Sequence, residues 1–66
     1  MSLAGKKIVI TGAAGGLGAG VAKVAHRQGA EVVLLDVVDG FTSELGETYS
    51  VDLLNPDAVQ TVFDEI

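Results

Sequence analysis

Short apolar runs separated by glycines dominate the chain, and three of them have the composition of buried strands. Residues 8–10 are β-branched and are followed at once by Thr11 and Gly12. Continuous apolar runs of this kind are typical of strands covered on both faces, as in a parallel sheet. Residues 31–36 predict a second buried strand that ends in a carboxylate, and residues 48–53 predict a third.

A helix is predicted from about Gly16 to Gln28, because apolar positions there recur with helical spacing. Basic side chains fall in its last turn, where the helix dipole favours positive charge. Gly29 follows at the position where a left-handed residue commonly ends a helix. The expected buried face of this helix consists of Leu17, Val21, Val24 and Ala25.

A second helix is predicted to begin after Asn55, which has the side chain of an N-cap. Pro56 would occupy the first helical position, where its missing N–H costs nothing, and Asp57 would meet the positive end of the dipole. Its expected buried face consists of Val59, Val62, Phe63 and Ile66.

The glycine-rich segment between the first strand and the first helix is a candidate phosphate-binding loop. Glycine there permits a tight turn, lets a pyrophosphate approach the backbone, and allows the helix to pack close to the sheet. The free N–H groups at the start of the helix attract phosphate. The expected cofactor-binding positions are Gly12, Gly15, Gly16, Leu17 and Gly18. Taken alone, such a loop could equally be a tight turn without a ligand.

Asp36, at the end of the second strand, is a candidate ribose-binding residue. A carboxylate there can accept both hydroxyl hydrogens of the adenosine ribose and repels a 2′-phosphate. The next residue is Val37 rather than arginine, and the glycine loop holds no base. The sequence therefore predicts NAD rather than NADP as the cofactor. The alternative is a solvated carboxylate at a strand end.

The pair Asp52-Leu53 follows the third predicted strand. Because the carboxyl ends of parallel strands open on one crevice, Asp52 could accept a hydrogen bond from the adenine amino group. An Asx turn that caps the next loop is the alternative for this carboxylate.

These elements predict an α/β fold, the first half (β-α-β-β-α) of a Rossmann-type doubly wound parallel sheet. We expect residues 1–66 to be the N-terminal part of a dinucleotide-binding domain. In the strand order 3-2-1 the first strand would be central in a complete sheet and lies at an edge in this half. The last predicted turn carries Asp64 and Glu65, the unfavourable sign for a helix end, and no cap follows. We therefore expect a fragment of a larger domain.

Composition narrows the classes of partner. The 66 residues carry a net charge of −5, which disfavours nucleic acid and anionic membranes as partners. The apolar runs are far too short to span a membrane. There is no cysteine, and the single His26 has no neighbours with metal-ligand spacing, so we expect no metal site. A cytoplasmic location is expected.

With these motifs in place, the sequence resembles the short-chain dehydrogenase/reductase family over its whole length. Leu3-x-Gly5-Lys6 is similar to the opening of that family, and the residues Thr11, Gly12, Gly16 and Gly18 match its Thr-Gly-x-x-x-Gly-x-Gly pattern. Asp36 matches its NAD-selecting acidic residue, and Asp52-Leu53 matches its adenine-contacting pair. The resemblance implies an NAD-dependent oxidoreductase that transfers hydride between nicotinamide and an alcohol or carbonyl substrate, and a homo-oligomer for the full-length protein.

Two branches of the family remain open. The loop also reads Gly12-x-x-Gly15-x-x-Gly18, the pattern of the extended branch of sugar epimerases and dehydratases. The opening residues favour the single-domain dehydrogenase branch.

No residue of this chain is predicted to be catalytic. The family's catalytic Ser and Tyr-x-x-x-Lys would lie downstream, and Tyr49 is followed four residues later by Leu53 rather than lysine. The favoured hypothesis is the cofactor-binding start of an NAD-dependent dehydrogenase. Two alternatives are a minimal NAD-binding module without chemistry and a structural piece that packs against a partner chain.

Overall fold

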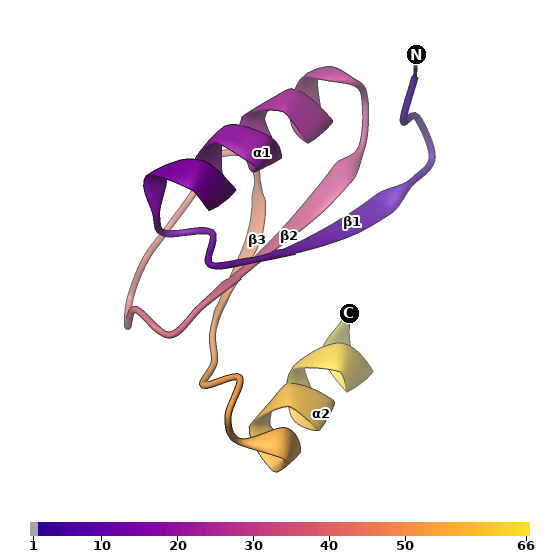
Figure 1. Ribbon diagram of the computed structural model, residues 1–66. Coiled ribbons are helices and arrows are strands. Elements are labelled where there is room, and N and C mark those ends of the chain that lie inside the picture. Colours follow the sequence, from indigo (N-terminus) through magenta and orange to yellow (C-terminus); the bar gives the residue numbers. More distant parts are fainter. Residues whose placement is uncertain (1) are drawn as a thin grey trace.

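The computed structural model describes residues 2–66, which form a three-stranded parallel sheet with one helix on each face (Figure 1). The sheet order is β1-β2-β3, so β2 is central and β1 lies at an edge. This confirms the α/β class and the strand order expected for half of a doubly wound sheet. The elements in chain order are β1 (Lys7–Thr11), α1 (Gly16–Arg27), β2 (Glu31–Asp36), β3 (Gly46–Ser50) and α2 (Pro56–Glu65).

Strand β2 joins two apolar cores, because its side chains alternate between the faces of the sheet. Val32 and Leu34 belong to the core under α1, whereas Val33 and Leu35 belong to the core under α2. All four side chains are at most 2% exposed. The sheet is therefore covered on both faces, which explains why β2 is continuously apolar.

The strands pair in a register that brings their carboxyl ends to one edge. Thr11 of β1 lies opposite Leu35, and Asp36 lies opposite Ser50 of β3. At the other end of this pairing, Val32 lies opposite Gly46. A Cβ at Gly46 would overlap the carbonyl oxygen of Val32, so the strands can approach this closely only because β3 begins with glycine.

Both helices begin and end much as the sequence predicts. Asn55 caps α2, its side chain accepting a hydrogen bond from the Ala58 N–H at 3.2 Å. Gly29 has φ +94° and follows the end of α1. The last turn of α2 has no basic residue of its own, but the Lys7 ammonium of β1 donates to the Ile66 carbonyl at 2.9 Å. A distant residue thus supplies the positive charge that the helix end lacks.

The third strand begins and ends earlier than predicted, at Gly46–Ser50 rather than 48–53. The Val51 N–H still donates to the Asp36 carbonyl at 2.8 Å, but the chain then turns away from the sheet. The turn forms because the Asp52 carboxylate accepts a hydrogen bond from the Leu54 N–H at 2.9 Å. The predicted start was two residues late, because glycine is depleted in strands and Gly46 gives no strand signal.

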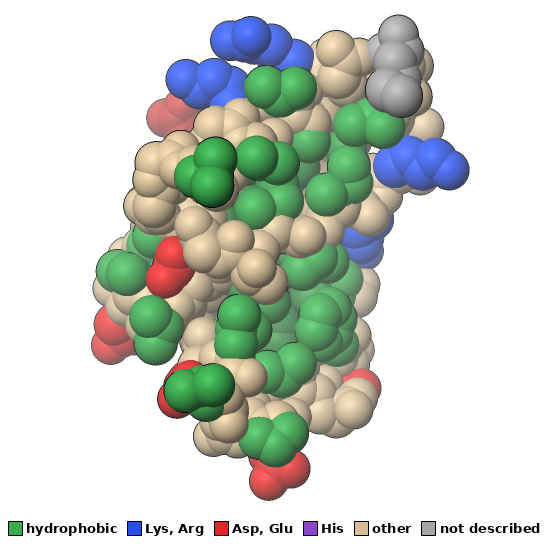
Figure 2. All heavy atoms as spheres, in the orientation of Figure 1, with side chains coloured by type: hydrophobic (Ala, Val, Ile, Leu, Met, Phe, Trp, Pro, Cys, Tyr) green, Lys and Arg blue, Asp and Glu red, His purple; other side chains and the backbone are tan. Residues whose placement is uncertain are grey.

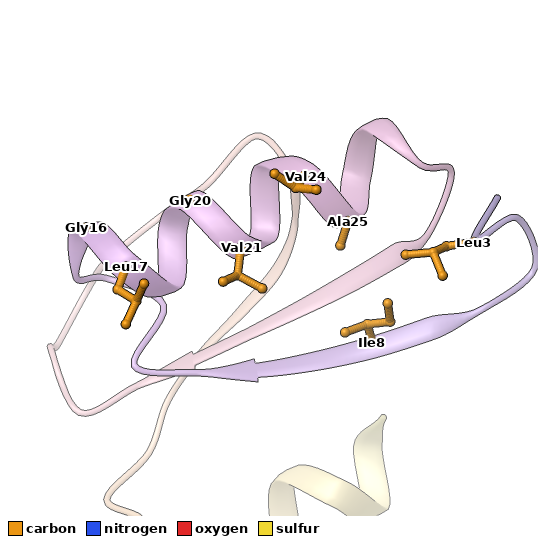
Figure 3. A pocket seen from close by; sticks show the side chains of 8 residues that line it. All are labelled: Leu3, Ile8, Gly16, Leu17, Gly20, Val21, Val24 and Ala25. Carbon is orange, nitrogen blue, oxygen red and sulfur yellow. The ribbon is translucent and has the colours of Figure 1, made fainter. Parts of the chain in front are cut away.

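The predicted buried face of α1 is wrong for three of its four residues. Leu17 is 86% exposed, Val21 51% and Val24 57%, whereas Ala22 and Ala25 are buried. The small alanines face the sheet and let the helix lie close to it. The larger side chains instead border an apolar surface beside β1, visible in the space-filling view and in close-up (Figures 2 and 3).

A smaller correction applies to α2. Val62 is buried and Val59 and Ile66 pack against the same core, but Phe63 is 48% exposed. Within residues 2–66 no helix is long and apolar enough to cross a membrane.

Candidate functional site

The candidate site lies at the edge of the sheet where all three strands end. The glycine-rich loop leaves β1 there, Asp36 closes β2, and Ser50 closes β3. Hydrogen bonds join these three chain segments directly, as described below. In open α/β sheets this edge is where ligands bind.

The glycine-rich loop is held in one conformation by backbone hydrogen bonds. The Ala13 N–H donates to the Leu35 carbonyl at 3.1 Å, which fastens the loop to β2. The Gly15 N–H donates back to the Gly12 carbonyl at 3.2 Å and closes a tight turn. Gly12 has φ +67°, a left-handed conformation that favours glycine. The loop is therefore a fixed element rather than a flexible linker.

Gly18 marks the closest approach of α1 to this loop. A Cβ at this position would overlap the Gly12 carbonyl oxygen and lie 2.8 Å from the Gly12 carbonyl carbon. It would also lie 3.0 Å from the Ala13 Cα. All these neighbours are backbone atoms, so no side chain can rotate away to make room.

The start of α1 presents unpartnered N–H donors. Its N-cap is Gly15, which has no side chain to accept a hydrogen bond, and the first turn carries no acidic residue. The N–H groups of Gly16, Leu17 and Gly18 have no acceptor within the helix, because the first intrahelical bond runs from Ala19 to Gly15. Together with the helix dipole, these donors suit a phosphate group.

Asp36 accepts backbone hydrogen bonds from two sides. Its Oδ2 accepts from the Ala14 N–H at 2.9 Å and its Oδ1 accepts from the Val38 N–H at 3.2 Å. Donation from Ala14, followed by Val38 and Val37, holds the pKa of the Asp36 carboxyl below its usual 3.8. The group is therefore ionised at neutral pH. Each oxygen keeps a further lone pair that could accept a ligand hydroxyl.

Two exposed apolar side chains follow the ends of β2 and β3. Val37 is 68% exposed and Leu53 49% exposed, so both could contact a flat, apolar ligand ring. Asp52 is exposed and forms the Asx turn to Leu54, the alternative role that its sequence position allows. A contact of Asp52 with adenine stays a prediction.

Two residues, Ala14 and Ser50, contribute hydrogen bonds at this edge that the sequence did not predict. The Ala14 N–H that binds Asp36 leaves no sequence signal, since every residue except proline has this donor. Ser50 donates its hydroxyl to the Val38 carbonyl at 2.9 Å. A polar residue at the last position of a strand, two residues before Asp52, is a signal that could have identified it.

Charge is distributed unevenly over the molecule. Lys6 and Lys7 precede or begin β1, and Lys23 and Arg27 lie in the second half of α1, so all four basic residues lie away from the carboxyl ends of the strands. Figure 2 shows the basic side chains spread over the upper half of the view. The opposite edge is acidic, which disfavours ligands with extra phosphates.

The apolar surface between α1 and β1 adjoins the candidate site at Gly16 and Leu17. It encloses a groove of about 550 Å³ lined by aliphatic side chains and glycines, including Leu3, Ile8 and Val24 (Figure 3). Among residues 2–66 no polar side chain lines it, so its side chains offer no hydrogen-bonding group that would orient the hydroxyls of a nucleotide. No group of His, Cys, Asp or Glu within residues 2–66 could hold a metal ion.

Comparison with known proteins places this geometry in a family. Residues 8–66 match the model of the NAD dependent epimerase/dehydratase family. The chain belongs to this family. The prediction of a dinucleotide-binding segment of the short-chain dehydrogenase/reductase type is confirmed, as is NAD as the cofactor type.

Several proteins that this chain resembles are dehydrogenases. D-xylose 1-dehydrogenase of Caulobacter vibrioides is 41% identical over 75 residues, which cover 98% of this chain and 30% of the relative. The solved structure of Thermoplasma acidophilum aldohexose dehydrogenase has a TM-score of 0.85 at 30% identity, covering 97% of this chain and 25% of that one. The structure of a 4-hydroxyisoleucine dehydrogenase complexed with NADH has a TM-score of 0.76 at 26% identity, and the match covers 91% of this chain and 27% of that one. The chain thus spans less than a third of each relative.

Proposed function

We propose that this chain binds the adenosine and pyrophosphate of NAD in an oxidoreductase that transfers hydride between nicotinamide and an alcohol or carbonyl. The observation that carries the proposal is the position of the ionised Asp36 carboxylate beside the glycine-rich loop, at a hydrogen bond of 2.9 Å to the Ala14 N–H. A ribose acceptor and a phosphate-binding helix end are thereby held at one edge of one sheet.

Each part of the cofactor has a group to meet it in this proposal. The pyrophosphate would bind the N–H groups of Gly16, Leu17 and Gly18, with Gly12 and Gly15 shaping the loop. The ribose hydroxyls would donate to Asp36. The adenine would lie between Val37 and Leu53, with its amino group donating to Asp52. The bound cofactor supplies the hydride chemistry at its nicotinamide end.

No residue of this chain is assigned a catalytic role. Tyr49 donates its hydroxyl to the Glu47 carboxylate at 3.1 Å, and this hydrogen bond raises the pKa of Tyr49 above its ordinary 10.0. A phenol that must exchange protons near neutral pH needs a shift in the other direction. We therefore place the catalytic acid and base outside this chain. Since two relatives are named for sugars, aldoses are the first substrates to test.

The test compares NADH and NADPH binding to the protein and to its Asp36→Ala variant. Loss of the ribose hydrogen bonds should lower the affinity for NADH. The affinity for NADPH should fall less, because charge repulsion of its 2′-phosphate is relieved. The dissociation constants are measured by fluorescence titration, and Asp39→Ala serves as the matched control because it removes the same charge three residues away. Equal weakening of both cofactors by Asp36→Ala would contradict the assignment.

An epimerase or dehydratase is the second candidate, favoured by the family match and by the spacing Gly12-x-x-Gly15-x-x-Gly18. Such enzymes regenerate their NAD within each turnover, whereas a dehydrogenase accumulates NADH. Incubation of the full-length protein with NAD and an aldose, followed by measurement of NADH absorbance, separates the two. A non-catalytic module would bind NADH and turn over neither substrate class. A cytoplasmic, homo-oligomeric full-length protein completes the proposal.

A further inference from the structure

Three hydrogen bonds in series connect the ends of all three strands. The Ala14 N–H donates to Asp36 Oδ2, and the Val38 N–H donates to Asp36 Oδ1. The Val38 carbonyl in turn accepts from the Ser50 hydroxyl at 2.9 Å. Ser50 is thus linked through one residue to the carboxylate that faces the ribose in the proposed function.

We propose that Ser50 is a positioning residue that sets the preference for NAD over NADP by fixing the orientation of Asp36. This inference rests on the proposed function and deepens it. Ser50 itself would not touch the cofactor. It would act through Val38, whose two backbone groups are both held, one by Asp36 and the other by Ser50.

The end of β3 forms two hydrogen bonds with the turn that follows β2. The Val51 N–H donates to the Asp36 carbonyl at 2.8 Å, which fixes the backbone of Asp36. The Ser50 hydroxyl fixes Val38 two residues later. The Val38 side chain is 50% exposed and supplies little packing of its own. Without the hydroxyl, Val38 keeps only the hydrogen bond from its N–H to Asp36 Oδ1, while the Val51 N–H still holds the Asp36 carbonyl.

The position of the hydroxyl argues against a purely stabilising role. The bond between Ser50 and Val38 is exposed, so water could satisfy the Val38 carbonyl if the hydroxyl were removed. Its loss should therefore cost little stability. What water cannot replace is a fixed geometry at Oδ1 of Asp36. A carboxylate held in one orientation presents its free lone pairs to two ribose hydroxyls and its charge to a 2′-phosphate.

The test uses Ser50→Ala, Ser50→Thr and Ser43→Ala in the full protein. Ser50→Ala removes only the hydroxyl, and Ser50→Thr retains it in a strand that tolerates β-branching. Ser43 lies in the β2–β3 connection, as Val38 does, and its hydroxyl oxygen accepts a hydrogen bond from the Leu45 N–H at 3.1 Å. Dissociation constants for NADH and NADPH are measured for each variant, with circular dichroism as the check on folding.

Ser50→Ala should raise the dissociation constant for NADH by about 3- to 10-fold, the effect of one lost hydrogen bond. The dissociation constant for NADPH should change less. The preference for NADH then falls in Ser50→Ala and is restored in Ser50→Thr. Ser43→Ala should leave the preference unchanged. The ratio of the two constants is a sound readout because partial unfolding lowers both affinities equally.

An unchanged ratio in Ser50→Ala, in a protein that prefers NADH, would overturn this inference and leave the proposed function standing. A change of similar size in Ser43→Ala would also overturn it, because any loosening of the connection would then suffice. A wild-type protein with no preference for NADH would overturn both the inference and the proposed function.

Discussion

Replacing Gly18 by alanine tests whether the close contact between α1 and the glycine-rich loop shapes the site. The new Cβ would overlap the Gly12 carbonyl oxygen and lie 2.8 Å from its carbon, where nothing but backbone can move. Relief of this overlap requires the loop to shift, which strains or breaks the bond of 3.2 Å between the Gly15 N–H and the Gly12 carbonyl.

The expected change in the free energy of unfolding is the sum of two costs and one gain. Overpacking against rigid neighbours costs about 1–3 kcal/mol. A lost backbone hydrogen bond costs about 1 kcal/mol. Alanine in place of glycine in a helix gains about 1 kcal/mol. Gly18→Ala should therefore destabilise the protein by about 1–3 kcal/mol in total.

Gly20 provides the matched control in the same helix. A Cβ there would meet no atom within 4 Å, so only the gain in helix propensity remains. Gly20→Ala should stabilise by about 1 kcal/mol, which separates the two variants by about 2–4 kcal/mol. The free energy of unfolding is measured by urea titration, with the slope of the transition compared between variants.

Cofactor binding provides a second readout of the same substitution. A displaced loop should weaken NADH in Gly18→Ala, whereas Gly20→Ala should bind it as the parent does. If Gly18→Ala were as stable as Gly20→Ala and bound NADH equally well, the loop would not depend on this contact and the reasoning would be refuted.

Two further predictions concern a helix cap and a carboxylate. Asn55→Ala removes the acceptor of the Ala58 N–H and should lower the free energy of unfolding by about 1 kcal/mol. Asn55→Ser keeps a capping oxygen and should retain most of the wild-type stability. Urea titrations that give equal stability for Asn55→Ala and wild type would contradict the capping role. The pKa of Asp36 lies below 3.8 because backbone N–H groups, that of Ala14 foremost, favour its ionised form. Its contribution to folding is therefore fully present above pH 3.8 and is lost as the pH falls through the lower folded pKa. A carboxyl NMR titration should find the midpoint of Asp36 below 3.8, and a midpoint at or above that value would contradict the geometry.

Local chemistry made most of the fold predictable. The run 31–36 matches β2 at both ends, because an apolar run bounded by charged residues has few alternatives. The start of α2 followed from Asn55 and Pro56, whose side chains act within one helical turn. The glycine-rich loop was located for the same reason, since its conformation depends on the glycines within it.

The errors arose where packing depends on distant segments. The helical spacing correctly identified one apolar side of α1, but the sheet contacts its small residues, Ala22 and Ala25, rather than Leu17 or Val21. Periodicity weights large side chains and cannot tell which part of an apolar stripe a sheet will cover. The bond between Ala14 and Asp36 joins residues 22 positions apart, so no local pattern could predict it.

The glycine at the start of β3 has a consequence for how the sheet aligns as it folds. Strand β3 carries no regular alternation of large apolar residues, so hydrophobic burial alone specifies its pairing with β2 only weakly. In the observed register a Cβ at position 46 would overlap the Val32 carbonyl oxygen, so this close approach requires glycine there. Gly46 therefore favours the observed register between β2 and β3. The same register places Ser50 opposite Asp36 at the far end of the strand, so the glycine at one end of β3 bears on the geometry of the site at the other.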